Sequence, residues 1–158
     1  MSNFFLFSIH LFKDINNLKN KNVFLIEDPI YFTDFKYHKL KLAYHRASMK
    51  YYEDYLKKNK INVKYINLLD SNNFYKSMKS NKIKMYEPFD NKLSKKINKL
   101  FSNIEIINSL NFLVTKNFLD ENKNEFYKNN SYNHSGFYKM QRKRFNILMN
   151  KDGTPKGG

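Results

Sequence analysis

Residues 22–66 read NVFLIEDPIYFTDFKYHKLKLAYHRASMKYYEDYLKKNKINVKYI, and this stretch decides the fold. Its short apolar run from Val23 to Ile26 predicts a strand buried on both faces. Apolar and polar residues alternate from Ile61 to Ile66, which predicts a strand nearer the edge of a sheet. Between them, residues 38–58 carry apolar side chains at steps of three and four, which predict one long helix. Strand, helix and strand in this order indicate a parallel βαβ unit.

The same alternation of strands and helices continues on both sides of this stretch. We expect further strands at residues 4–7, 83–86 and 104–107, with 112–115 as a candidate sixth, and helices that begin at Asp70 and at Asp90. The predicted architecture is a Rossmann-like α/β fold, a five-stranded parallel sheet flanked by helices. This α/β domain is placed at residues 1–115.

A helical linker is placed at residues 116–158. Within it, residues 116–135 are expected to form a helix that runs into a polar loop, and residues 137–149 a second helix. The residues from Asp152 to Pro155 predict a turn.

The composition limits the possible classes of protein. The 158 residues carry a formal net charge of +15, with 26 lysines against only 3 arginines. Two interpretations of this charge stay open, namely weak attraction to a nucleic-acid backbone and surface lysines that reflect an AT-rich genome. The absence of Cys excludes disulfides, Cys-ligated zinc and an iron–sulfur cluster held by this chain alone. With neither a long apolar run nor a signal-peptide pattern, we expect a soluble intracellular protein.

The residue types needed for common enzyme chemistry are missing or badly placed. The four glycines, at 136, 153, 157 and 158, all lie far from the predicted strand-to-helix turns. This placement excludes the glycine-rich loops that hold dinucleotides and nucleoside triphosphates. His38 and His45 lie seven residues apart on one helix, too far for a shared metal ion, and no nucleophile is paired with an oriented base. We therefore expect neither catalytic residues nor metal ligands in this chain.

Two acidic turns follow predicted strands. Glu27-Asp28-Pro29 comes after the second strand and Glu87-Pro88 after the fourth. Ligands of open parallel sheets bind beyond the carboxyl ends of the strands, so these carboxylates are candidates for accepting hydrogen bonds from a ligand. The alternative is that they cap turns and helices, which proline favours at such positions. The sequence leaves both interpretations open.

Two longer patterns resemble a known family. One contains E-x-x-x-x-F, H-K-x-K-L and H-R-A-S-M-K within residues 22–56. The other contains F-Y-x-x-x-R and L-M-N-x-D-G-x-P-x-G-G within residues 137–158. Together they resemble the amino-terminal part of the deoxyribodipyrimidine photolyase-related proteins, also called prokaryotic (6-4) photolyases or iron–sulfur bacterial cryptochromes and photolyases. The resemblance extends over nearly the whole chain and is looser at residues 1–21 and 116–135.

The resemblance implies that this chain is the antenna domain of a light-driven DNA repair enzyme. Family members hold a light-harvesting chromophore, typically 6,7-dimethyl-8-ribityllumazine, against this domain. FAD and the 4Fe–4S cluster belong to a helical catalytic domain further along. The sequence stops at Gly158, where the family pattern continues through a W-x-F-D stretch, and it has neither Cys nor Trp. We therefore expect a truncated protein that is inactive by itself.

Two other functions remain as alternatives. One is half of a split photolyase that works in trans with a separately encoded catalytic domain. The other is a non-catalytic remnant or binding module with weak affinity for nucleic acid, carried by surface lysines.

The resemblance also implies roles for individual residues. The family's early G-D-Q-L turn, which borders the chromophore, stands here as Ser8-Ile9-His10-Leu11, without the glycine and the acidic side chain. Chromophore contacts are implied for Ser8, Ile9, His10, Glu27, Asp28 and Leu42. Contacts with the catalytic domain are implied for Phe137, Tyr138, Arg142 and Lys143, which match a basic helix leading to it. Ordinary packing is the alternative for both groups.

Overall fold

The computed structural model of the protein describes residues 2–156. These residues form two units, and the division after Asn111 lies close to the boundary expected after Thr115. The strands of the first unit are β1 (Asn3–Leu6), β2 (Asn22–Ile26), β3 (Val63–Ile66), β4 (Ile83–Tyr86) and β5 (Ile104–Ile107). Its helices are the 3-10 turn η1 (Asn16–Leu18), α1 (Pro29–Phe32), α2 (Lys39–Lys58), α3 (Ser71–Met78) and α4 (Asn91–Leu100).

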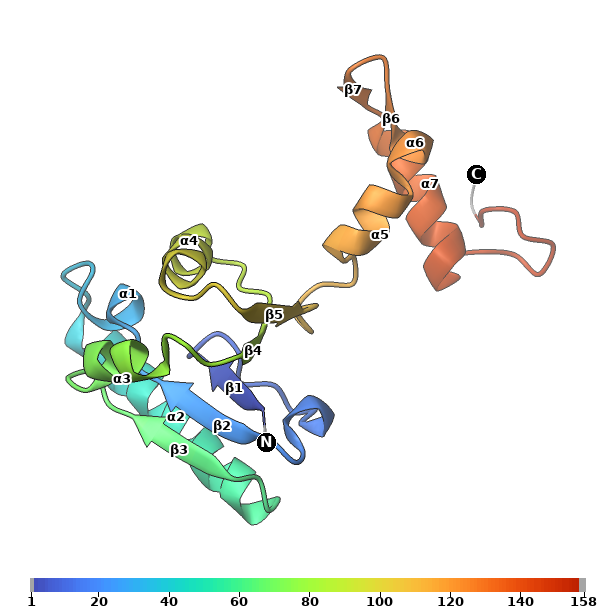
Figure 1. The fold of residues 1–158 in the computed structure, drawn as a ribbon. Helices are drawn as coiled ribbons and strands as arrows, with labels where there is room; N and C mark the ends of the chain where they lie inside the picture. Colours follow the sequence, from blue (N-terminus) through green and yellow to red (C-terminus); the bar gives the residue numbers. More distant parts are fainter. Residues whose placement is uncertain (1, 157–158) are drawn as a thin grey trace. The chain divides into compact units, whose positions relative to one another are not determined.

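The five strands form one parallel sheet in the order β3-β2-β1-β4-β5 (Figure 1). Phe5 of β1 pairs with Phe24 of β2 on one side and with Met85 of β4 on the other. The chain first adds strands on one side of β1 and then crosses to the other side to form β4. The order of the sheet therefore reverses between β1 and β4. The predicted five-stranded α/β fold is confirmed.

Helices cover the two faces of the sheet, and alternate side chains of β1 point to opposite faces. Phe4 and Leu6 belong to the core cluster that contains Met49, Tyr52 and Leu56 of α2. Phe5 belongs to the other cluster, which contains Tyr75 of α3 and both Leu93 and Ile97 of α4. Both clusters are built from fully or nearly fully buried residues. The central strand β1 is therefore buried on both faces of the sheet, as expected.

The boundaries of the helices follow local capping chemistry. Asp90 accepts hydrogen bonds from the N–H groups of Lys92 and Leu93 and begins α4, as predicted. Asp70 precedes α3 but makes no side-chain capping bond. In α3 the buried aromatic residue is Tyr75, whereas its neighbour Phe74 is only half-buried.

The second unit is less regular than the predicted helical linker. It contains α5 (Lys116–Glu121), α6 (Lys123–Phe126), β6 (Tyr127–Lys128), β7 (Ser131–Tyr132) and α7 (His134–Phe145). Residues 112–115 do not form the candidate sixth strand, because Thr115 instead caps α5 through the N–H of Phe118.

The polar stretch at 128–131 is a tight hairpin and not an open loop. Asn129 and Asn130, at φ angles of 51° and 57°, join the antiparallel strands β6 and β7. Asparagine is among the residues that most readily adopt this left-handed conformation. Helix α7 also begins and ends earlier than expected, because Asn133 caps it and Asn146 terminates it at a φ of 52°. The turn predicted at 152–155 is present, with Asp152 accepting from the N–H of Thr154.

Candidate functional site at the carboxyl edge of the sheet

Glu27 follows β2 directly, and its own N–H bonds to the carbonyl of Ile66 at the end of β3. The chain therefore places the Glu27 carboxylate at the carboxyl edge of the sheet, beside the first half of α2. The side chain has no solvent exposure. A carboxylate buried in this way must be hydrogen-bonded or paired, because an isolated buried charge is very costly.

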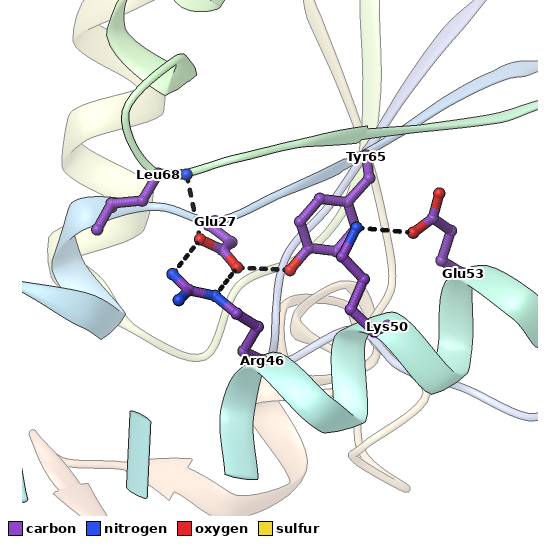
Figure 2. A network of polar contacts seen from close by, with 6 residues as sticks. All are labelled: Glu27, Arg46, Lys50, Glu53, Tyr65 and Leu68. Carbon is purple, nitrogen blue, oxygen red and sulfur yellow. Dashed lines mark hydrogen bonds and ion pairs between the residues drawn. The ribbon is translucent and has the colours of Figure 1, made fainter. Parts of the chain in front are cut away.

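Four hydrogen bonds to Glu27 meet this requirement (Figure 2). Arg46 of α2 donates from Nε to Oε1 at 2.6 Å and from a terminal nitrogen to Oε2 at 2.7 Å. The Tyr65 hydroxyl of β3 donates to Oε1 at 2.6 Å, and the backbone N–H of Leu68 donates to Oε2 at 3.1 Å. Glu27 thus joins α2 to β2, to β3 and to the loop after β3.

The electrostatics of this network follow from burial and from the paired charges. Burial by itself raises the pKa of Glu27, but the hydrogen bonds from Arg46, Tyr65 and Leu68, together with the Arg46 charge, outweigh it and lower the pKa. The bond to Glu27 raises the pKa of Arg46. Lys50 lies 3.4 Å from the centre of the Tyr65 ring and also pairs with Glu53 at 3.1 Å. Glu27 and Arg46 are therefore both charged at neutral pH.

Asp28 performs the equivalent task on the other face of the sheet. One of its oxygens accepts from the N–H of Ile30 and caps α1, which has Pro29 at its first position. The other accepts from the Tyr75 hydroxyl of α3 at 2.5 Å and from Lys96 of α4 at 2.7 Å. The sequence left two interpretations of Asp28 open, and its bond from the Ile30 N–H is helix capping. A ligand contact for Asp28 stays a prediction.

His10 lies after β1, inside a cage of aromatic rings. Its ring centre is 5.7 Å from Phe7, 6.2 Å from Phe12 and 5.9 Å from Tyr86 at the end of β4. The side chain is fully buried, and neither ring nitrogen has a hydrogen-bond partner within residues 2–156. Burial lowers the pKa of His10 to about 4. The backbone of Glu87 lies nearby and raises the pKa in part, but its placement is not that of a well-formed hydrogen bond. The imidazole is therefore neutral at pH 7.

Ser8 adds a second unpaired polar group to the same loop. Its Oγ is buried and has no partner among the described residues, although the residue as a whole is half-buried. Most buried polar atoms in folded proteins are hydrogen-bonded, so unpaired groups of this kind require an explanation. Together with His10, Ser8 leaves three unpaired polar atoms next to the point where the order of the sheet reverses.

Ile9 and Leu42, for which the resemblance also implies chromophore contacts, do not both lie where the order of the sheet reverses. Ile9 is half-buried and packs against the cluster under α3 and α4, whereas Leu42 packs against the cluster under α2. The structure therefore places Ile9 and Leu42 in the cores on opposite faces of the sheet.

Sequence reasoning also missed Arg46 and Tyr65, the two side chains that donate hydrogen bonds to Glu27. The sequence contains Arg46 in the H-R-A-S-M-K pattern, but nothing in it indicates which carboxylate the guanidinium meets. A hollow of about 530 Å³ adjoins Glu27 and Arg46 and is lined further by residues 67–70 of the loop after β3.

The residues expected to contact a catalytic domain lie on α7 in the second unit. Phe137 packs against Phe126, with ring centres 5.1 Å apart. Tyr138 is exposed, and Arg142 lies over its ring and donates hydrogen bonds to the carbonyls of Ile147 and Leu148. Lys143 is exposed in the last turn of α7. An interdomain role for these four residues stays a prediction.

The family described as deoxyribodipyrimidine photo-lyase-related protein matches residues 4–158, nearly the whole chain. No curated protein matches the chain significantly. Within residues 2–156, no helix combines the length and the apolar character needed to cross a membrane. By the extent of the family match and by its fold, the chain belongs to the deoxyribodipyrimidine photo-lyase-related protein family.

Proposed function

We propose that the α/β unit is an antenna domain that binds a small planar chromophore at the carboxyl edge of its sheet. The observation that carries the proposal is the set of unpaired buried atoms in one loop, namely Ser8 Oγ and both ring nitrogens of His10. None of these atoms makes a well-formed hydrogen bond within residues 2–156, although the backbone of Glu87 lies near His10. A polar heterocycle would supply the missing donors and acceptors.

The position of these groups supports the same conclusion. Ligands of open α/β sheets bind beyond the carboxyl ends of the strands, where the strand order reverses. In this sheet the reversal lies between β1 and β4. His10 belongs to the loop after β1, and its ring packs against Tyr86 at the end of β4. The residues present therefore fit a heteroaromatic ligand at this point.

Each chain residue has a definable task in this proposal. Ser8 and His10 would hydrogen-bond the ligand, and the rings of Phe7, Phe12 and Tyr86 would pack around it. Because the His10 ring is fully enclosed, the loop after β1 must open for a ligand to reach it. When bound, a chromophore such as 6,7-dimethyl-8-ribityllumazine would absorb near-ultraviolet or blue light and pass the excitation to a flavin used in DNA repair.

Glu27 and Asp28 have a different task, because their oxygens already accept hydrogen bonds from α1, α2, α3, α4 and β3. They hold the helices in place around the edge of the sheet. We therefore assign them to shaping the site and not to direct contact with the ligand.

Binding of 6,7-dimethyl-8-ribityllumazine to the full chain tests the proposal. Titration followed by the fluorescence of the ligand should give saturable binding. His10→Phe and Ser8→Ala should each weaken it about tenfold, since each leaves a buried group of the ligand without its partner. His134→Phe is the matched control, because His134 is exposed in the second unit, and its affinity should equal that of the unmodified chain. The absence of saturable binding, or equal affinity in all three variants, would refute the proposal.

A further inference from the structure

A groove of about 730 Å³ runs along α2, and one of its lining residues is Leu11, which follows His10 in the sequence. Its lining also includes Lys13 from the loop after β1 and six α2 residues, Tyr44, Ala47, Ser48, Tyr51, Tyr52 and Tyr55. Its volume falls in the range typical of ligand sites. Four tyrosines in one groove make its surface aromatic and mostly apolar.

Two of these tyrosines form a fixed floor. The Tyr52 hydroxyl donates to the carbonyl of Phe12 at 2.8 Å, and the Tyr55 hydroxyl donates to that of Lys13 at 3.0 Å. The Tyr52 and Tyr55 rings also stack on each other, with centres 5.8 Å apart. The loop and the helix are therefore locked together, and the groove does not have to be assembled when a ligand arrives.

The other two tyrosines have no task in the fold. Tyr44 is 73% exposed and Tyr51 is 78% exposed, and neither makes a hydrogen bond or a ring contact with any residue in the range 2–156. They are seven residues apart on one face of α2, which is about 10 Å along the helix axis. That distance corresponds to roughly three base steps of a nucleic-acid strand at 3.4 Å each.

The charge around the groove selects a polyanion. Lys13 lines the groove without an ion pair inside the described range, and Lys41 and Lys58 lie one turn before and one turn after the α2 lining residues. The nearest exposed acids are Asp14 and Asp54. A second copy of this chain is disfavoured, because each copy carries a net charge of +15 and like charges repel.

We propose that this groove binds single-stranded nucleic acid, with bases stacked on Tyr44 and Tyr51 and the backbone attracted by Lys13 and the neighbouring lysines. Stacking on exposed aromatic rings inside a basic groove is the usual mode of sequence-tolerant single-strand binding. A duplex would not fit this mode, because its bases already stack on one another. This inference goes beyond the chromophore proposal and does not depend on it.

The test is fluorescence anisotropy of a labelled oligothymidylate titrated with the full chain at low salt. The double variant Tyr44→Ala/Tyr51→Ala should lose at least about tenfold in affinity, as expected for the loss of two stacked bases. Tyr44→Phe/Tyr51→Phe keeps the rings and should stay within about twofold of the unmodified chain. Tyr138→Ala removes another exposed tyrosine, 58% exposed and located in the second unit, and should leave binding unchanged.

Several outcomes would overturn the inference. Equal affinity of the double alanine variant and the unmodified chain would show attraction by dispersed lysines alone. Equal competition by duplex and single strand would exclude base stacking. Concentration-dependent dimerisation that the double alanine variant abolishes, without any effect on oligonucleotide binding, would assign the groove to a second copy. Because all of the substituted tyrosines are exposed, unchanged circular dichroism melting should show that each variant is folded.

Discussion

Replacing Arg46 with methionine tests whether its pair with Glu27 anchors α2 to the sheet. Methionine retains much of the length of arginine and removes the charge. In the variant, Glu27 keeps only the Tyr65 hydroxyl and the Leu68 N–H as donors. In the unmodified chain this carboxylate has no solvent exposure, so both donors that it loses come from Arg46.

The expected size of the effect follows from the two Arg46 bonds and their exposure. Two charge-assisted hydrogen bonds contribute about 3 to 6 kcal/mol when both partners are buried. The Arg46 side chain is 54% exposed, so solvent screening reduces this contribution. We expect the free energy of unfolding of Arg46→Met at pH 7 to fall by about 2 to 3 kcal/mol, roughly half of the buried value.

The pH dependence of this loss gives a sharper test than its size. In the unmodified chain the pKa of Glu27 is lowered, so its stabilising contribution is present above the ordinary pKa of 4.5 and is lost as the pH falls through the folded-state value. In Arg46→Met, burial becomes the dominant influence and raises the pKa of Glu27 above 4.5. The folded variant then binds a proton more readily than the unfolded chain. The stability difference between the two proteins should therefore shrink as the pH falls from 7 toward 4.5.

Urea unfolding followed by circular dichroism at several pH values measures this difference. Arg46→Lys is the control, because it keeps the charge but not the paired geometry, and it should lose less stability than Arg46→Met. A loss below about 0.5 kcal/mol, the usual range of surface substitutions, would contradict the anchoring role. A loss that does not change with pH would contradict the electrostatic explanation.

Three further predictions concern other parts of the chain. Because the pKa of His10 is lowered from 6.5 to about 4, the unfolded chain binds more protons in that interval, and stability should fall by up to about 3 kcal/mol as the pH drops from 6.5 to 4. His10→Phe should remove this component in the same urea measurements, and an unchanged pH profile would refute the assignment. Tyr75→Phe removes a donor to buried Asp28 and should lower the free energy of unfolding in urea by about 1 to 3 kcal/mol. An unchanged value would mean that the bonds from Lys96 and Ile30 are enough to stabilise the Asp28 carboxylate. Asn130→Val places a β-branched residue at a φ of 57° and should destabilise the β6–β7 hairpin by about 1 to 2 kcal/mol. Amide hydrogen exchange in the hairpin should become faster, and unchanged exchange would contradict the turn geometry.

Much of the first unit was predictable because its patterns are local. The apolar run of β2 and the three- and four-residue steps of α2 indicate their elements without any knowledge of the rest of the chain. The N-cap at Asp90 depends on residues only two and three positions away. Because all of these strands are short and separated by helical patterns, a parallel sheet was the only simple arrangement.

The second unit was harder to predict, because its structure depends on backbone conformations that the apolar pattern does not show. The hairpin at Asn129 and Asn130 has only two residues in each strand, which is too short for an alternating apolar pattern to indicate it. The candidate strand at 112–115 failed because a capping hydroxyl, from Thr115, competed with the apolar run before it.

The sequence alone determined the five strands of the parallel sheet, the long helix and the family, because these depend on residues close together along the chain. Tertiary structure decided which polar groups meet. Glu27 and Arg46 are 19 residues apart and Glu27 and Tyr65 are 38 apart, and only the register of α2 over the sheet brings them within hydrogen-bonding distance. The same helix leaves Tyr44 and Tyr51 exposed in the groove, and the packing of Phe7, Phe12 and Tyr86 buries His10. Burial and pairing are properties of the packed chain, so the candidate sites emerged only with the fold.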